Sequence, residues 1–125
     1  MAKKILIVDD EPDLLKVLEV RLKNTGYEVF TGVNGQEALD TARKMKPDLI
    51  ILDLYLPVKD GDEVAQILKN DKELKSIPIV LISATTRTLS ERAKACGANT
   101  FLSKPFEPEE FVFLVKKLLN GEKQA

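Results

Sequence analysis

Short apolar runs alternate with segments of helical periodicity along the chain, and this alternation constrains the fold more than any other feature. The runs cover residues 4–8, 27–31, 48–52, 77–82 and 100–102. Three of them, 4–8, 48–52 and 77–82, are continuously apolar after their first residue, a pattern typical of strands buried on both faces of a sheet. The helical segments cover residues 11–24, 35–45, 62–69, 87–96 and 108–119. This order predicts a doubly wound (βα)5 fold with a parallel five-stranded sheet and right-handed crossovers.

Residues at the helix ends support these boundaries. Pro12 stands in the first turn of the first helix and Gly26 follows its end. Asn34 and Glu37 have the spacing of a capping box, and Pro108 opens the last helix. We therefore expect the segments to be separate helices joined by short loops.

Size and charge indicate a single soluble domain. The chain has 125 residues, 44% of them hydrophobic and 31% charged, with a net charge of −1. We expect one domain over residues 1–125, with a core at about 3–119 and a flexible tail at 120–125. A near-zero charge argues against direct nucleic-acid binding. No apolar run is long enough for membrane insertion, and the N-terminus lacks a signal-peptide cleavage region, which predicts a cytoplasmic location.

Two scarce residue types limit the chemistry. The chain has no His and only one Cys, Cys96. His-based catalysis, an internal disulfide and a thiolate zinc site within this chain are thereby excluded. Any reaction must use Asp, Glu, Lys, Ser, Thr or the backbone.

Polar residues follow four of the five predicted strands. Ligands of open α/β sheets bind outside the carboxyl ends of the strands, so these residues are expected to share one site. They are Asp9, Asp10, Glu11, Asp53, Ser83 and Lys104. Clustered carboxylates raise one another's pKa unless a cation lies between them. Because carboxylate oxygens suit Mg²⁺, the pattern predicts a magnesium site.

A carboxylate beside a metal ion can act as a nucleophile toward phosphorus, so Asp53 is a candidate for an aspartyl phosphate. Lys104 would add a second positive charge and Ser83 a hydrogen bond to a phosphoryl oxygen. Simpler interpretations stay open for each residue alone. Asp10 can be the N-cap of the first helix, Asp53 can cap a turn, Ser83 can be a loop hydroxyl and Lys104 a solvated charge.

Four segments, "ILIVDDEPD", "LIILDLYLPVKDG", "VLISA" and "FLSKPF", occur in this order. In these segments the chain resembles the receiver domain of two-component response regulators of the chemotaxis-regulator type, from Lys3 to about Leu119. The resemblance implies a flavodoxin-like three-layer sandwich with strand order 2-1-3-4-5. It also implies a phospho-accepting signalling protein, not a turnover enzyme.

The resemblance further assigns roles at the site. Asp53 would accept a phosphoryl group from a sensor histidine kinase or a phosphotransfer protein. Mg²⁺, for which Mn²⁺ can substitute, would be held by Asp9, Asp10, Asp53 and the backbone carbonyl of Tyr55. A downstream protein target and a phosphorylation-dependent dimer are the implied partners.

The same resemblance implies a switch. Lys104 would contact the phosphoryl group, and its bond to Pro105 would be cis. Ser83 would move toward the phosphoryl oxygen, and Phe101 would turn inward behind it. The family often has an acid or amide where this chain has Tyr55 and Thr85, so we expect slow self-dephosphorylation.

Two of the predicted helices have features that suggest contact with other proteins or a change of state. Segment 87–96 has a thin apolar stripe, which suits an element that shifts between two states, or simply a short surface helix. Phe113 points away from the apolar stripe of the last helix, so it marks a partner surface or is an isolated exposed aromatic.

Three other functions compete with this assignment. A pseudo-receiver, which binds partners without phosphorylation, is the main alternative. An electron carrier of the flavodoxin type is disfavoured because "DDEPD" would repel a phosphate. A haloacid-dehalogenase-type phosphatase is disfavoured because that family separates its two Asp residues by one residue, whereas Asp9 and Asp10 are adjacent.

Overall fold

The computed structural model describes residues 2–84 and 86–120, and in this part of the chain five strands alternate with five helices. The elements are β1 (Lys4–Val8), α1 (Pro12–Asn24), β2 (Glu28–Gly32), α2 (Gly35–Met45), β3 (Leu49–Asp53), α3 (Gly61–Lys69), β4 (Ile79–Ser83), α4 (Thr86–Cys96), β5 (Thr100–Ser103) and α5 (Pro108–Leu119). The predicted order is confirmed. Of the tail expected at 120–125, residues 121–125 lie outside the described residues.

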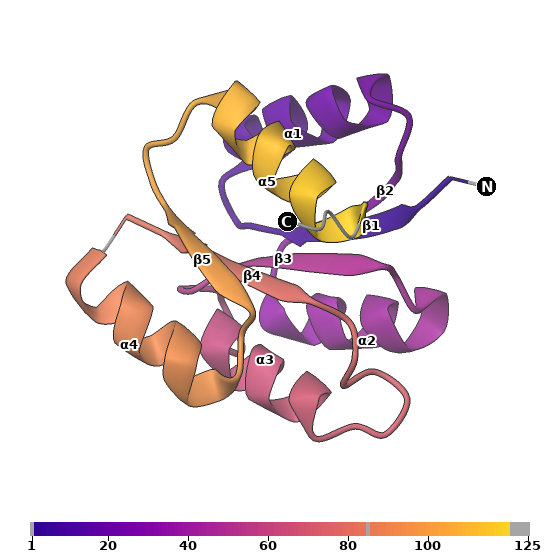
Figure 1. Ribbon diagram of the computed structural model, residues 1–125. Coiled ribbons are helices and arrows are strands. Elements are labelled where there is room, and N and C mark those ends of the chain that lie inside the picture. The colour runs from indigo at the N-terminus through magenta and orange to yellow at the C-terminus, as the bar shows by residue number, and fades with distance from the viewer. Residues whose placement is uncertain (1, 85, 121–125) are drawn as a thin grey trace.

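The five strands form one parallel sheet in the order β2-β1-β3-β4-β5, as predicted. Helices α1 and α5 cover one face, and α2, α3 and α4 cover the other (Figure 1). The result is the expected three-layer sandwich. Because the strands are parallel, their carboxyl ends all lie at one edge of the sheet, and the polar residues predicted to form the site lie there.

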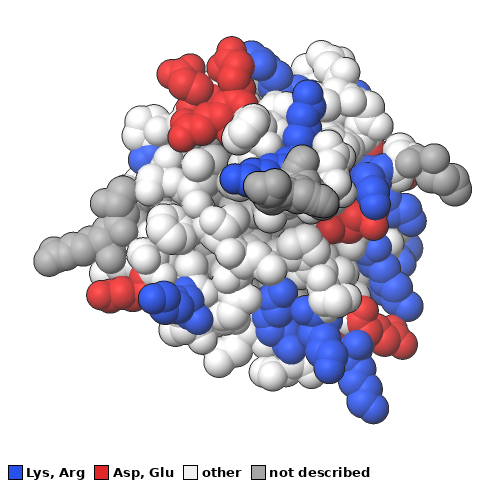
Figure 2. Space-filling model, viewed as in Figure 1, with Lys and Arg blue, Asp and Glu red and all other residues white. Residues whose placement is uncertain are grey.

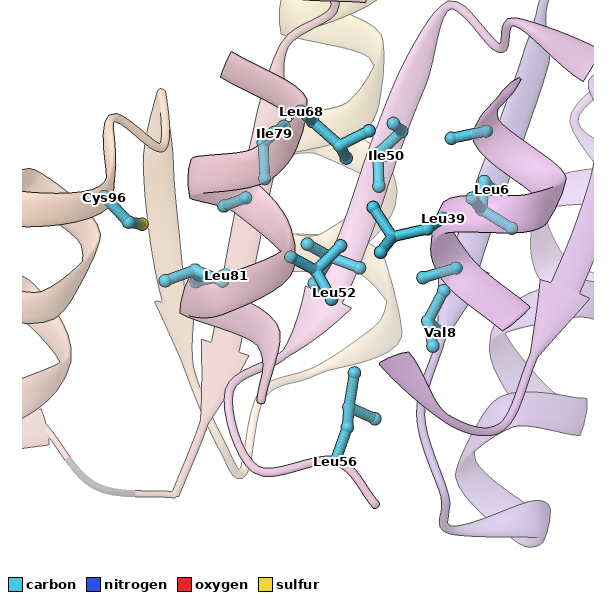
Figure 3. Close-up of a cluster of buried hydrophobic side chains, with 14 of the residues drawn as sticks. Leu6, Val8, Leu39, Ile50, Leu52, Leu56, Leu68, Ile79, Leu81 and Cys96 are labelled. Atoms are coloured by element: carbon cyan, nitrogen blue, oxygen red, sulfur yellow. The ribbon is translucent and has the colours of Figure 1, made fainter. Parts of the chain in front are cut away.

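Two apolar clusters hold the layers together, one on each side of the sheet. Even-numbered residues of β1 and β3 point toward α2 and α3, as Figure 3 shows for Leu6 and Leu52. The odd-numbered neighbours Ile5 and Ile51 pack with Phe111 under α1 and α5. Both faces of these strands are buried, which explains why their sequences are continuously apolar.

The fourth strand begins two residues later than its apolar run predicts. Pro78 has no N–H to donate to a neighbouring strand, although its carbonyl accepts a hydrogen bond from Ile50 at 3.1 Å. The strand starts at Ile79, whose N–H donates to Asn99 Oδ1 at 2.9 Å. Apolar content alone could not show where the ladder begins.

Capping of α2 follows the predicted pattern. Asn34 Oδ1 accepts a hydrogen bond from the Glu37 N–H at 2.9 Å. Glu37 in turn accepts from the N–H of Val33, at 2.9 Å, one residue before the cap. Two amides at the start of the helix are thus satisfied.

Charges are unevenly placed on the surface. Figure 2 shows Lys and Arg gathered over the loop before β4, at the lower right, and Asp and Glu gathered over the first turn of α5, at the upper left. The basic group at the lower right therefore lies toward the amino end of β4, and further Lys and Arg side chains stand elsewhere in this view, including the top of the molecule near the acidic group (Figure 2). Among the described helices, none combines the length and apolar character needed to cross a membrane.

Candidate metal and phosphoryl site

Asp9 and Asp53 are the two buried carboxylates at the edge where the strands end. They stand at the ends of adjacent strands, β1 and β3, and both are buried, with Asp9 0% exposed. Asp9 Oδ1 accepts a hydrogen bond from the Glu11 N–H at 2.9 Å, and Asp53 Oδ1 accepts from the Tyr55 N–H at 2.9 Å. Each side chain thus bonds the backbone two residues on, which fixes one oxygen and directs the other into the site.

The second oxygens of both carboxylates face Lys104. The Lys104 ammonium lies 2.7 Å from Asp53 Oδ2 and 3.1 Å from Asp9 Oδ2. It also lies 3.5 Å from Glu11 Oε1. The backbone N–H of Lys104 donates to the Ser83 carbonyl at 2.8 Å, which extends the pairing of β5 with β4 and brings the side chain over the carboxylates.

The pKa values of Asp9 and Lys104 reflect how the charges in the site are balanced. Burial raises the pKa of Asp9 to about 6, with the nearby Asp53 charge adding to the rise and the Glu11 N–H and Lys104 opposing it. Burial alone would lower the pKa of Lys104, but its contacts with Asp53 and Asp9 outweigh burial and raise that pKa. One cation therefore compensates two carboxylates only in part.

One buried oxygen lacks a hydrogen bond within the described residues. Asp9 Oδ2 forms an ion pair with the Lys104 ammonium at 3.1 Å, but no described group donates a hydrogen bond to it. Carboxylate oxygens of Asp9, Asp10 and Asp53 all lie within 4.8 Å of one another. A buried carboxylate oxygen without a hydrogen bond, in an all-oxygen cluster, fits a hard divalent cation such as Mg²⁺.

A pocket of about 300 Å³ opens over these groups. Its lining residues are Asp10, Glu11, Asp53, Tyr55, Ser83, Ala84 and Lys104. The site residues predicted on four strands are thus brought together. Ser83 is buried beneath the pocket and Asp10 is exposed at its edge.

Other predicted residues have mixed outcomes. The Lys104–Pro105 peptide bond is cis, as expected. The expectation that Asp10 could cap the first helix is wrong, because the N-cap of α1 is Glu11 and no side chain caps it. Phe101 on β5 is 39% exposed, so its ring is not turned inward here. Thr85 lies outside the described residues, and its proposed effect stays a prediction.

Arg92 lies beside the site and was not predicted to be functional. It projects from α4 toward Tyr55, with its Cζ 5.3 Å from the centre of the ring. Arg92 stands on α4, the helix with the thin apolar stripe, and no motif or spacing marks it. Only the packing of α4 beside the β3–α3 loop brings the two residues together.

The fold and the acidic pocket define a doubly wound α/β protein whose chemistry sits at the carboxyl edge of the sheet. The sequence matches the response regulator receiver domain family over residues 5–116, and the chain belongs to this family. It is a receiver domain of two-component signalling, as its motifs predicted.

Two curated relatives illustrate the similarity. The chain is 40% identical over 126 residues to the alkaline phosphatase synthesis transcriptional regulatory protein PhoP of Bacillus subtilis, covering 100% of this chain and 52% of PhoP. It is 37% identical over 120 residues to the polar-differentiation response regulator DivK of Brucella anthropi, covering 95% of this chain and 98% of DivK. The chain thus spans about half of one relative and nearly all of the other.

Solved structures agree with this assignment. The chemotaxis response regulator CheY4 of Vibrio cholerae is 33% identical, with a TM-score of 0.90 over 95% of this chain and 100% of that chain. The receiver domain of the sensor histidine kinase PA1611 from Pseudomonas aeruginosa is 28% identical, with a TM-score of 0.85 over 96% of this chain and 99% of that chain. The latter structure has a magnesium ion coordinated in its active-site cleft.

Proposed function

We propose that Asp53 accepts a phosphoryl group from the phosphohistidine of a sensor kinase or phosphotransfer protein. The observation that carries the proposal is the setting of the Asp53 carboxylate. It is buried at the floor of the pocket, with one oxygen on the Tyr55 N–H at 2.9 Å and the other 2.7 Å from the Lys104 ammonium. A nucleophile so positioned loses little freedom on reaction.

The transfer balances without a further reactant. A carboxylate oxygen of Asp53 attacks phosphorus while the phosphorus–nitrogen bond of the donor breaks, and the electron pair stays on the imidazole, which takes up a proton from solvent. Lys104 is within reach of the acceptor oxygen and offsets negative charge on the transferred group. Ser83 lines the same pocket, and its hydroxyl is proposed to hydrogen-bond a phosphoryl oxygen.

We propose that Mg²⁺ is the resident metal, with Mn²⁺ as a substitute. The side chains of Asp9, Asp10 and Asp53 and the backbone carbonyl of Tyr55 would hold it. The ion supplies positive charge that offsets charge developing on the transferring group. Two observations support this assignment, namely the buried Asp9 oxygen that accepts no hydrogen bond from the described residues and the magnesium ion in the PA1611 receiver domain.

Phosphorylation would then act on the surface through Phe101 and α4. The exposed Phe101 ring is proposed to turn inward when Ser83 moves toward the phosphoryl group. The chain would thus control a partner protein and not turn over a substrate as an enzyme does. We place this signalling in the cytoplasm, because a kinase needs ATP to form the phosphohistidine donor.

Phe113 is proposed as part of a partner or dimer surface. Its side chain is 67% exposed on α5, in a shallow groove shared with Arg21 of α1 and with Thr25, the C-cap of that helix. Substitution by Asp should leave the fold intact, because the ring contributes little to the core. Unchanged self-association and unchanged partner capture by Phe113→Asp would remove Phe113 from this role.

The proposal is tested by labelling the protein with acetyl phosphate as a small-molecule donor. Labelling that requires Mg²⁺ and is abolished by a chelator supports the phospho-acceptor function. A folded protein that takes up no label with Mg²⁺ present would favour the pseudo-receiver alternative, in which the same surface binds partners without phosphorylation.

A further inference from the structure

Arg92 ties helix α4 to the start of α3. Its Nε and Nη2 atoms each lie 2.8 Å from Asp62 Oδ2 in the first turn of α3. Nη2 also lies 3.8 Å from Asp60 Oδ2 at the N-cap of that helix. The side chain is partly buried, so its direction is set by these acidic groups.

The same guanidinium reaches Tyr55 in the loop between β3 and α3. Nη1 donates a hydrogen bond to the Tyr55 hydroxyl at 3.3 Å, and Cζ lies 5.3 Å from the ring centroid. A guanidinium at this distance is attracted to an aromatic ring as well as to its hydroxyl. Arg92 is thus anchored on Asp62 at one side and holds Tyr55 at the other.

Tyr55 is well placed to govern access to Asp53. Its backbone N–H binds Asp53 Oδ1, and its side chain lines the pocket that contains the acceptor carboxylate. The side chain is 47% exposed, so packing alone does not fix the ring. The contact with Arg92 restrains a ring that would otherwise swing between solvent and the pocket mouth.

We propose that Arg92 is a positioning residue that holds Tyr55 at the mouth of the acceptor pocket and thereby lengthens the lifetime of the phosphoryl group on Asp53. This inference rests on the proposed function. In the hydrolysis that it limits, a water oxygen attacks phosphorus, the bond from phosphorus to the Asp53 oxygen breaks, and its electron pair returns to the carboxylate. The proton of the water passes to solvent, and inorganic phosphate leaves.

The link gives α4 a defined influence on the site. Arg92 stands in the middle of α4, so a partner or a phosphorylation event that shifts this helix would also move Tyr55. The ion pair itself is partly exposed and contributes little to stability. The main effect of this ion pair is therefore to orient Arg92 and, through it, the Tyr55 ring.

The test is a double-mutant cycle on the rate of phosphoryl loss. The variants are Arg92→Met, Tyr55→Ala, the pair together, and Tyr55→Phe, with Lys94→Met on the same helix as the matched control. Each protein is loaded with acetyl phosphate and Mg²⁺, freed of donor, and followed by intact mass. Arg92→Met and Tyr55→Ala should each speed phosphoryl loss by about threefold to tenfold, as expected for losing one hydrogen bond and one cation–π contact.

The cycle separates positioning from a general effect on the fold. If Arg92 acts through Tyr55, Arg92→Met adds nothing in the Tyr55→Ala background, Tyr55→Phe gives an intermediate rate, and Lys94→Met matches the parent. Equal lifetimes for Arg92→Met and the parent, or the same acceleration without the ring, would overturn the inference. Should Arg92→Met fail to fold, Tyr55→Phe still decides, because an unchanged lifetime contradicts the role of the hydroxyl contact. A parent that takes up no phosphoryl group would instead refute the proposed function, and this inference with it.

Discussion

The ammonium of Lys104 lies 2.7 Å from Asp53 Oδ2, and 51 residues separate the two in the sequence. The same ammonium lies 3.1 Å from Asp9 Oδ2. One lysine, directly after the edge strand β5, thus contacts two carboxylates at the ends of the central strands β1 and β3. Without this cation, or a metal ion near it, the two buried carboxylates would carry uncompensated charge.

Replacing Lys104 by Met should therefore destabilise the protein in metal-free buffer. The side chain is only 14% exposed, and its loss leaves Asp9 and Asp53 facing each other. We expect the free energy of unfolding at pH 7 to fall by about 2–4 kcal/mol, as for other buried pairs that lose one partner. Urea unfolding measures this change, and added Mg²⁺ should reverse part of it.

The matched control is Lys46→Met, which removes an exposed lysine paired with Glu73 at 3.1 Å. Exposed ion pairs contribute little, so this variant should lie within about 1 kcal/mol of the parent. Equal effects of the two substitutions would show that Lys104 does not neutralise the carboxylates.

The raised pKa of Asp9 predicts an unusual dependence of stability on pH. An unfolded Asp releases its proton near 3.8, whereas folded Asp9 keeps it up to about 6. Between these values the native state binds more protons, so stability from this group is full below pH 4 and lost as pH rises through 6. The loss is on the order of 3 kcal/mol in metal-free buffer.

Asp9→Asn removes the titrating group and isolates its effect. The difference in unfolding free energy between variant and parent should grow in favour of the variant from pH 4 to pH 7. Chelator-treated protein and urea unfolding at several pH values provide the comparison. A difference that stays constant across this range would contradict the raised pKa.

Gly61 is required by its close approach to the acceptor strand. A Cβ at this position would lie 2.1 Å from the Asp53 carbonyl oxygen, a backbone atom that cannot move aside cheaply. Gly61→Ala should cost about 2 kcal/mol or more in stability and displace Asp53, with weaker Mg²⁺ binding. Gly32→Ala is the control, because its Cβ would meet its nearest neighbour at 3.4 Å. A Gly61→Ala protein as stable as the control would refute the steric argument.

Val58 stores strain in the loop beside the site. It has φ +73° and is 73% exposed, and the Lys59 N–H bonds the Pro57 carbonyl across it at 2.8 Å. This is a γ-turn with a positive central φ, which a β-branched residue adopts at a cost. Val58→Gly should raise the free energy of unfolding by about 0.5–1 kcal/mol. Thermal unfolding measures it, and a lower melting temperature would contradict the strain.

The layers of the fold were predictable because burial acts on short stretches of sequence. Runs such as residues 5–8 are apolar at every position because helices cover both faces, and their alternation with helical segments implies a parallel sheet. The meeting of Asp9, Asp53 and Lys104 follows from the topology, since parallel strands end at one edge. The sequence shows which residue types follow the strands, and the fold class predicts that these residues lie close together.

Other features needed three-dimensional packing. The contact between Arg92 and Tyr55 joins residues 37 apart through side chains that no pattern distinguishes from solvated surface. The alternative that made Asp10 the N-cap of α1 was wrong by one residue, since the N-cap is Glu11. The Glu11 N–H donates to the Asp9 side chain, so Asp9 forms the turn before the helix. Local propensity could not reveal that the Asp9 side chain was engaged in this way.

The central claim, that Asp53 is the phosphoryl acceptor, is tested most directly by intact mass after treatment with acetyl phosphate and Mg²⁺. The parent and Asp40→Asn, which alters an exposed Asp on α2, should each gain the mass of one phosphoryl group. Asp53→Asn should remain folded and gain nothing. Phosphoryl uptake by Asp53→Asn equal to that of the parent, or no uptake by the folded parent, would contradict the account.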